Sequence, residues 1–284
     1  MDGIIINADD YGMALEINEA IEILSKSGCV TSTSLMVNMP YAKPIRELFL
    51  DVPDIGVGAH LNLTEGKPLS PINEVSTLVN ENGDFFSYSQ LVKRSRRGHV
   101  SFKQCKLEIR RQILEAKKLT NDRIDHWDSH QGIHRSEPLT TVFLSICNEM
   151  DMPAMRTHKH YWLSTIPQGR LLTSIRPNGG LRSKIIETYY CWLRWRFNRF
   201  FLGPKGIIVL TELGQVKELI NRQNDLEGIY EIVCHPSVNT SDLGQTSMLE
   251  ERVKEYEALA NSEVVSLLAK SKDAKLLITF KDMQ

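Results

Sequence analysis

Short apolar runs of strand length alternate with helical segments along this chain, and this alternation constrains its fold more than any other feature. The runs are rich in β-branched residues and cover residues 4–7, 30–38, 55–63, 123–129, 154–157, 206–211, 229–234 and 275–280. Apolar residues recur at helical spacing in residues 17–24, 101–119 and 247–268. Strands that alternate with helices are typical of parallel βαβ units. A chain of 284 residues suits a TIM-like (β/α) barrel, which takes about 250 residues. An open doubly wound sheet is the alternative.

Two stretches interrupt the alternation. Residues 64–100 contain the tight-turn signal ENGD and then KRSRRG, and residues 158–205 contain IRPNGG and then ETYYCWLRWRFNRFF. Because the alternation resumes after each stretch, we expect a single (β/α)-barrel catalytic domain, 1–284, with insertions at about 64–100 and 158–205. The aromatic and arginine-rich stretch suits a helix packed on the barrel or against a second subunit. A sugar-stacking lid and a membrane contact are the alternatives for it.

The overall composition is that of an ordinary globular protein. The chain is 42% hydrophobic and 24% charged, with a formal net charge of −1, so no global field draws it to nucleic acid or to an anionic membrane. It has neither a bilayer-spanning apolar stretch nor a signal-peptide pattern at its N-terminus. Its five cysteines are odd in number and widely spaced, which indicates reduced thiols. We therefore expect a cytoplasmic protein without nucleic-acid or membrane partners.

Ionisable residues follow four of the apolar runs. They are Asp9 and Asp10 after the first run, His60 in the third, His126, Asp128, His130 and His134 in and after the fourth, and His235 after the seventh. The carboxyl ends of the strands carry the active site in barrels of this kind. Four strand ends that finish in His or Asp are far from random in a chain with eight histidines.

The fourth run, RIDHWDSHQGIH, is the most informative of these stretches. Residues two apart in a strand share a face, so His126, Asp128 and His130 point one way and Trp127 and Ser129 the other. Three polar side chains of ligand type on one face require partners. They line a wet cavity or hold a metal ion.

Asp10, His60 and His130 come from different strands and are expected to converge at the barrel mouth. Two imidazoles and one carboxylate with an open position form the ligand count of a catalytic metal site. Nitrogen ligands favour Zn²⁺ or another transition ion over Mg²⁺. The neighbouring Asp9 stays free to act as a general base. Without the other strand ends, the two aspartates would suit a helix N-cap equally well.

Taken together, these stretches resemble the YdjC-like carbohydrate deacetylase family, which includes the chitooligosaccharide deacetylases. The motifs that carry the resemblance occur in the same order, and they are INADDYGM, VTSTSLMVN, GVGAHLNLTEGKPL, HWDSHQGIH and EIVCHP. The resemblance implies a TIM-like barrel, usually dimeric, that removes acetyl groups from N-acetylated sugars with one divalent ion, commonly Mg²⁺. It matches Asp10, His60 and His130 to metal ligands and Asp9 to the catalytic base. It matches His235 to a histidine that acts on the leaving group; the alternative for His235 is a cap on a strand end.

The chain departs from the family pattern at two positions. Gly132 replaces a histidine in a pattern like DSHQHVH, which bears on substrate contacts, and Ser237 replaces a common glycine. We expect Asp128 to orient a ligand imidazole. The full group expected to contact substrate or to support the ligands is Asp128, His126, His134 and Asn38.

The sequence therefore predicts a hydrolase that cleaves the linear amide C–N bond of an N-acetylated amino sugar or short chitooligosaccharide. It would use one divalent ion, Mg²⁺ or Zn²⁺, act on a small carbohydrate and form a homodimer. One alternative is a metal-dependent hydrolase of a phosphorylated sugar, for which only Gly179 and Gly180 offer a weak phosphate cradle. The other is a carbohydrate-binding protein that has lost turnover.

Overall fold

The structure is a computed structural model. It describes residues 2–157, 160–163, 172–174, 188, 192, 195, 201–209, 228–241, 243, 248–273 and 276–283. The nine strands of the described part form one sheet, in the order β5-β4-β3-β2-β1-β9-β8-β6-β7. The strands are β1 (Gly3–Tyr11), β2 (Ser32–Leu35), β3 (Gly56–Leu61), β4 (Ile124–Ser129), β5 (Ala154–Met155), β6 (His160–Leu163), β7 (Leu172–Ser174), β8 (Gly206–Val209) and β9 (Ile229–Cys234).

Every strand pairing in this sheet is parallel except the one between β6 and β7. The sheet curls into an open, TIM-like half-barrel, which confirms the predicted fold class. Strands β1 to β4 are buried along their whole length, as expected for parallel strands that are covered on both faces.

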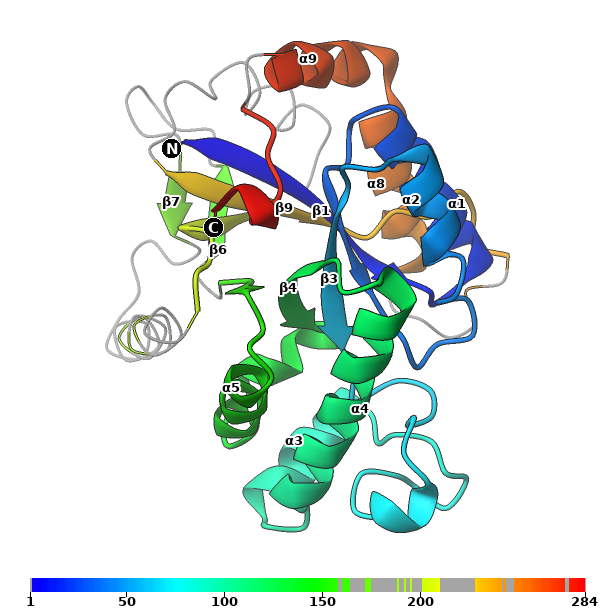
Figure 1. The fold of residues 1–284 in the computed structure, drawn as a ribbon, viewed down its shortest axis with the longest axis vertical. Helices are drawn as coiled ribbons and strands as arrows, with labels where there is room; N and C mark the ends of the chain where they lie inside the picture. Colours follow the sequence, from blue (N-terminus) through cyan, green and yellow to red (C-terminus); the bar gives the residue numbers. More distant parts are fainter. Residues whose placement is uncertain are drawn as a thin grey trace.

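Helices surround the curved sheet in Figure 1, with α1, α2 and α8 on one flank and α3, α4 and α5 on another. The helices are α1 (Leu15–Lys26), α2 (Ile45–Asp51), α3 (Tyr88–Arg96), α4 (Phe102–Thr120), α5 (Leu139–Glu149), α8 (Leu249–Ala260) and α9 (Ser262–Asp273), with short 3₁₀ turns η1 (Ile72–Glu74), η2 (His130–Arg135) and η4 (Phe280–Met283). Two of these helices have identifiable ends. Gly28, with φ of 79°, follows the end of α1, and Ser101 caps α4 by accepting a hydrogen bond from the Gln104 amide.

The predicted strand at residues 275–280 is wrong. Its described part forms one parallel bridge with β1, between Leu277 and Ile4, and continues into the 3₁₀ turn η4. Asp282 stabilises this turn, because its carboxylate accepts hydrogen bonds from both the amide and the hydroxyl of Thr279. Phe280 is thereby buried against the sheet instead of extending it.

Two strands lie within residues 158–205, for which no strand was expected. β6 pairs in parallel with β8, and β7 pairs antiparallel with β6. The aromatic and arginine-rich stretch lies largely outside the described residues. In residues 64–100, Glu108 of α4 holds the chain in place, because its buried carboxylate accepts hydrogen bonds from the Leu69 and Ser70 amides.

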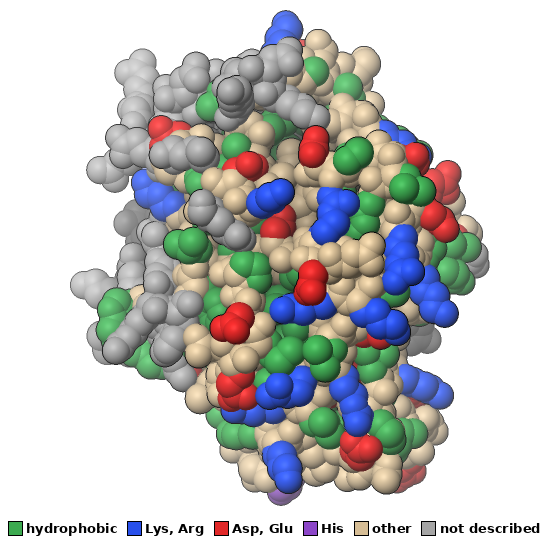
Figure 2. Space-filling model, in the orientation of Figure 1, with side chains coloured by type: hydrophobic (Ala, Val, Ile, Leu, Met, Phe, Trp, Pro, Cys, Tyr) green, Lys and Arg blue, Asp and Glu red, His purple; other side chains and the backbone are tan. Residues whose placement is uncertain are grey.

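The surface carries both signs of charge. Figure 2 shows lysine, arginine and acidic side chains interspersed over the face viewed, in agreement with the net charge of −1. Among the helices described, none combines the length and the apolar character that a membrane crossing requires.

Candidate active site

A bulge in β1 explains how two adjacent aspartates serve one site. Ala8 pairs with Thr33 and Tyr11 with Leu35, so β1 uses one residue more than β2 between these pairs. Asp10 has a φ of 71°, in the left-handed region that Asp tolerates better than most residues. In a regular strand neighbouring side chains point to opposite faces, whereas here both carboxylates reach the same buried cluster.

Asp10, His60 and His130 lie together at the carboxyl ends of β1, β3 and β4. Asp10 Oδ1 is 3.3 Å from His60 Nε2 and 2.9 Å from His130 Nδ1. Atoms bound about 2.1 Å from one ion lie about 3.0 Å apart in octahedral geometry and about 3.4 Å apart in tetrahedral geometry. The spacing therefore matches that of ligands around one ion, and all three side chains are buried.

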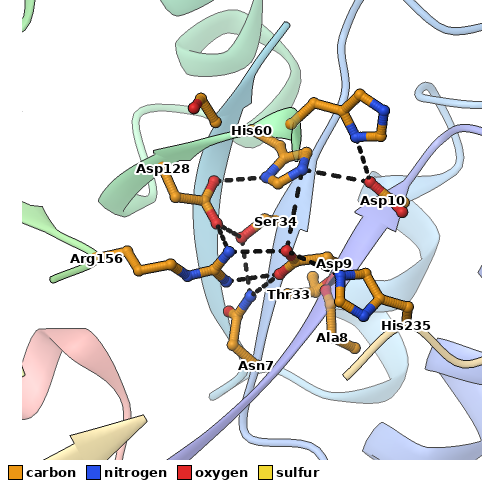
Figure 3. Close-up of polar contacts among 12 residues, drawn as sticks. Asn7, Ala8, Asp9, Asp10, Thr33, Ser34, His60, Asp128, Arg156 and His235 are labelled. Atoms are coloured by element: carbon orange, nitrogen blue, oxygen red, sulfur yellow. Dashed lines mark hydrogen bonds and ion pairs between the residues drawn. The ribbon is translucent and has the colours of Figure 1, made fainter. Parts of the chain in front are cut away.

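Asp128 fixes the orientation of His60. Its Oδ1 accepts a hydrogen bond of 2.6 Å from His60 Nδ1, which leaves Nε2 facing Asp10 (Figure 3). Metal-ligating histidines usually donate their other N–H in this way. Burial opposes the charged form of His60, but the Asp128 and Asp9 carboxylates and a hydrogen bond to Asp10 outweigh it and raise the His60 pKa to about 10.

Asp9 is held by a clamp that the sequence did not reveal. Two guanidinium nitrogens of Arg156 donate to its two oxygens at 2.7 and 2.6 Å, and the Asn7 amide donates to Oδ1 at 2.8 Å. Figure 3 shows Arg156 between Asp9 and Asp128, with which it also forms an ion pair of 2.7 Å. The catalytic candidate and the partner of His60 are therefore fixed by one cation.

Glu231 of β9 completes this clamp by accepting a 2.7 Å hydrogen bond from Arg156 Nε. Burial raises the pKa of Glu231 to about 7; Arg156 opposes the shift, and Asp9 and Asp128 add to it. Arg156 and Glu231 are single charges inside otherwise apolar strand runs, in AMRT and IYEIVC. That signal could have marked them as buried partners.

Arg252 of α8 is a second cation that was not expected. Its Nη2 donates to Asp10 Oδ2 at 2.5 Å, and the side chain is buried. Burial alone raises the pKa of Asp10, but His130, His60 and Arg252 outweigh it and hold that pKa well below its usual range. Nε and Nη1 of Arg252 are buried and have no hydrogen-bond partner among the described residues. Arg252 thus compensates the buried negative charge of Asp10.

His235 follows β9 and faces the same cluster. Its Nε2 is 3.6 Å from Asp9 Oδ2 and its Nδ1 is 3.9 Å from Glu255 Oε2. Glu255 also accepts a hydrogen bond from the His235 amide. The side chain is 28% exposed, so His235 can meet a molecule that enters from solvent.

Three other predicted site residues make different contacts. His126 lies deeper in the barrel, where its ring stacks on Phe280. His134 bonds to Ser129 and packs edge-on against Trp127. The Asn38 amide group donates to the carbonyl oxygens of Glu65 and Lys67, so it braces the segment after β3.

Gly132 has a left-handed φ of 62°, in the turn after His130. A Cβ at Gly132 would overlap the guanidinium of Arg135, which fills that space. Arg135 therefore stands where a side chain at position 132 would be.

The charge balance of this cluster suits a divalent cation. The buried acidic residues are Asp9, Asp10, Asp128 and Glu231, and the buried arginines are Arg156 and Arg252. Carboxylates outnumber guanidiniums by two, so these buried residues carry an excess of negative charge. A divalent ion on the Asp10, His60 and His130 atoms would balance this excess, so the residues fit a metal ion.

Fold and site together define a class of protein. It is an open, TIM-like barrel with a buried Asp/His cluster, able to hold a metal ion, at the carboxyl ends of its strands. Within that class, the chain belongs to the YdjC-like protein family, whose sequence profile matches residues 3–270.

Similar proteins match over nearly the whole chain. A carbohydrate deacetylase of Thermoanaerobacter pseudethanolicus is 34% identical over 97% of this chain and 96% of its own length. Another, from Clostridium beijerinckii, is 29% identical over 99% of both chains. A crystal structure from Enterococcus faecalis V583, described as that of a proposed cellobiose-phosphate cleavage protein, is 25% identical. It has a TM-score of 0.73 and covers 98% of this chain and 97% of its own.

Proposed function

We propose that this protein is a metal-dependent carbohydrate deacetylase that hydrolyses the acetamide of an N-acetylated amino sugar or short chitooligosaccharide. The observation that carries the proposal is the convergence of Asp10, His60 and His130 at ligand spacing, with Asp9 and His235 beside them. The matching relatives named carbohydrate deacetylases support the reaction class.

The metal ion, held by Asp10, His60 and His130, would supply Lewis acidity to the acetyl carbonyl and to the attacking water. Asp9 is the general base: its Oδ2 is 4.0 Å from His60 Nε2, and Arg156 and Asn7 hold it in one orientation. It takes the proton that the water gives up as the C–O bond forms.

His235 is the general acid. An amide nitrogen leaves poorly unless it receives a proton; His235 Nε2 lies 3.6 Å from Asp9 Oδ2, and the His235 side chain is partly exposed to solvent. It donates a proton to the sugar nitrogen as the C–N bond breaks, so that acetate and a free amino sugar are released.

The test is acetate release from N-acetylglucosamine oligomers of increasing length. The purified protein is stripped of metal and reloaded with Zn²⁺, Mg²⁺ or Mn²⁺; two imidazole ligands favour Zn²⁺, and the family resemblance favours Mg²⁺. Asp9→Asn should abolish turnover and keep metal binding, whereas His60→Ala should lose both. Asp54→Asn, at an exposed carboxylate, is the matched control and should behave as wild type.

A phosphorylated sugar is the second candidate substrate, favoured by the description of the Enterococcus faecalis structure. The same preparations are therefore offered phosphorylated disaccharides, with acetate and inorganic phosphate measured separately. Binding of sugar without release of acetate or phosphate would contradict both reactions and favour a carbohydrate-binding protein.

The proposal also includes a homodimer, as the family resemblance implies, and a cytoplasmic location, as the odd and widely spaced cysteines indicate. Light scattering coupled to size exclusion tests the dimer, since a chain of 32.4 kDa should elute at twice that mass. A monomeric mass at the concentration used in the assay would contradict it.

A further inference from the structure

A second bulge lies in β4, directly below the candidate active site. Val57 of β3 pairs with Ile124, but the next residue, Gly58, pairs with His126, so Asp125 is an extra residue in β4. The extra residue allows adjacent side chains to meet. Asp125 Oδ1 lies 2.6 Å from His126 Nδ1, and both residues are buried.

The neighbouring strand makes room for this pair with glycines. A Cβ on Gly56 would lie 2.7 Å from Asp125 Oδ2, and a Cβ on Gly58 would overlap Nε2 of His126. The GVG sequence of β3 and the DH sequence of β4 are therefore complementary. Phe280 closes the arrangement by stacking on the His126 ring, with 3.8 Å between centroids and 11° between planes.

Hydrogen bonds continue from this pair to the candidate active site. His126 Nε2 is 3.3 Å from Ser34 Oγ, and the Ser34 hydroxyl donates to Asp128 Oδ2 at 2.9 Å. Asp128 Oδ1 then accepts the 2.6 Å hydrogen bond from His60 Nδ1. All five residues are buried, and together they form a continuous chain of polar contacts inside the barrel.

The far end of this chain reaches the opposite end of the barrel. Asp125 lines a cavity of about 570 Å³ together with Thr31, Gly56 and Thr279. Thr31 precedes β2 and Gly56 begins β3, whereas His60 lies near the carboxyl end of β3. The chain therefore connects the two ends of the barrel.

The contacts run from Asp125 to His126 and on to Ser34, as in the Asp-His-Ser triad of a serine hydrolase. The other contacts of Ser34 exclude that role. A nucleophilic serine must give its proton to the histidine and must meet substrate. Ser34 donates its proton to Asp128 instead, accepts a hydrogen bond from Asn7 and is fully buried. These three residues therefore hold another side chain, Asp128, in place and do not attack a substrate.

We infer that Asp125, His126 and Ser34 are positioning residues that fix Asp128, and through it His60, for metal binding. The inference rests on the proposed function, because its outcome is the orientation of a proposed metal ligand. Removal of a residue that hydrogen-bonds to a metal ligand typically changes the metal affinity 10–100-fold. In this structure the residues that support His60 include Asp128 and, beyond it, Ser34, His126 and Asp125.

The test measures the affinity of the metal-free protein for Zn²⁺ alone by calorimetry, with thermal unfolding recorded for each variant. Ser34→Ala cuts the chain and should weaken Zn²⁺ binding about tenfold or more. Ser34→Thr keeps the hydroxyl and should restore the affinity. Asp125→Asn should weaken binding several-fold, whereas Asp122→Asn, at an exposed carboxylate lining the same cavity, should not.

Nitrogen-15 NMR of the metal-free protein supplies a second measurement, because a purely structural role would not alter the ring of His60. The wild type should show His60 protonated at Nδ1, and Ser34→Ala should broaden or shift that signal. Folded Ser34→Ala and Asp125→Asn proteins that bind Zn²⁺ as the wild type does would overturn the inference. Failure of the proposed function has a different outcome: the wild type itself would then bind no metal ion.

Discussion

Asp10 adopts a left-handed backbone conformation, and this one residue turns two neighbouring carboxylates toward the same cluster. The conformation is uncommon for residues other than glycine and is tolerated best by Asp and Asn. Asp10→Asn therefore tests the carboxylate without disturbing the backbone. Asp10 also carries its own cation, Arg252, so its negative charge persists in a buried position.

Glu231 provides a prediction about pH. Its pKa is raised from 4.5 in the unfolded chain to about 7 in the folded protein, mainly by burial. The native state therefore holds this proton more tightly, and the contribution to stability, present below pH 4.5, is lost as the pH rises through about 7. Because glutamine does not titrate, Glu231→Gln should gain stability relative to wild type over this window, by on the order of 3 kcal/mol at most.

Urea unfolding at a series of pH values from about 4 to about 8 measures this difference, because that range covers the whole interval over which Glu231 titrates. Glu257→Gln, at an exposed glutamate of α8, is the matched control and should show a constant difference from wild type. A constant difference for Glu231→Gln as well would contradict the prediction.

Residue chemistry made part of this cluster predictable. Asp9, Asp10, His60 and His130 were identified because they end strand runs, and the ends of parallel strands meet at one edge. Arg156 and Glu231 were missed, because their contact requires knowledge of which strands face each other across the barrel. Their unpaired charges inside apolar runs indicated only that partners had to exist.

The close packing of β3 against β4 leads to a prediction about the stability of variants at Gly58 and His126. Gly58→Ala should destabilise the protein by about 1–3 kcal/mol, because its Cβ would overlap His126. His126→Ala removes the ring and so makes room for that Cβ. The double variant should therefore lose clearly less stability than the two single losses added together.

Denaturant unfolding of the four proteins in this cycle gives the coupling energy. If the losses of stability in the two single variants simply add up in the double variant, then Gly58 does not serve to make room for His126. Gly98→Ala serves as the control, because a Cβ there would meet nothing within 4 Å and only its φ of 74° is strained. Its loss should be unaffected by His126→Ala.

Elements with strong periodicity were predictable, and irregular ones were not. The helices α1 and α4 matched their predicted segments, because their apolar spacing and their end residues agree. The bulges at Asp9–Asp10 and at Asp125 left no such pattern, since a single extra residue only shifts which side chains share a face. Residues 275–280 had the composition of a strand, but tertiary packing turned Phe280 inward.

For the whole molecule, alternating strands and helices were enough to predict a barrel of parallel strands. The openness of that barrel was not predictable, because it depends on whether the two edge strands of the sheet, β5 and β7, come together, and no local pattern encodes that. β6 and β7 show the same limit. They lie in residues that were expected to be an insertion, yet β6 continues the parallel sheet beside β8.

Burial across the whole molecule should also protect its thiols. The four described cysteines, Cys29, Cys105, Cys147 and Cys234, are free and buried. Burial raises the pKa of the Cys105 thiol to about 12, and it raises the pKa values of the other three as well. At about pH 8 only about one Cys105 in ten thousand would be a thiolate, the form that reacts with iodoacetamide.

These four cysteines should therefore resist iodoacetamide in the native protein and react fully in guanidinium, as read by peptide mass mapping. Because each thiol becomes reactive only when its surroundings open, slow labelling that speeds up with added denaturant would report opening of the barrel. Rapid labelling of any of the four in the native state would contradict the burial described here. Four protected thiols, in the segment after α1, in α4, in α5 and in β9, thus test whether the half-barrel opens as one cooperative unit or in parts.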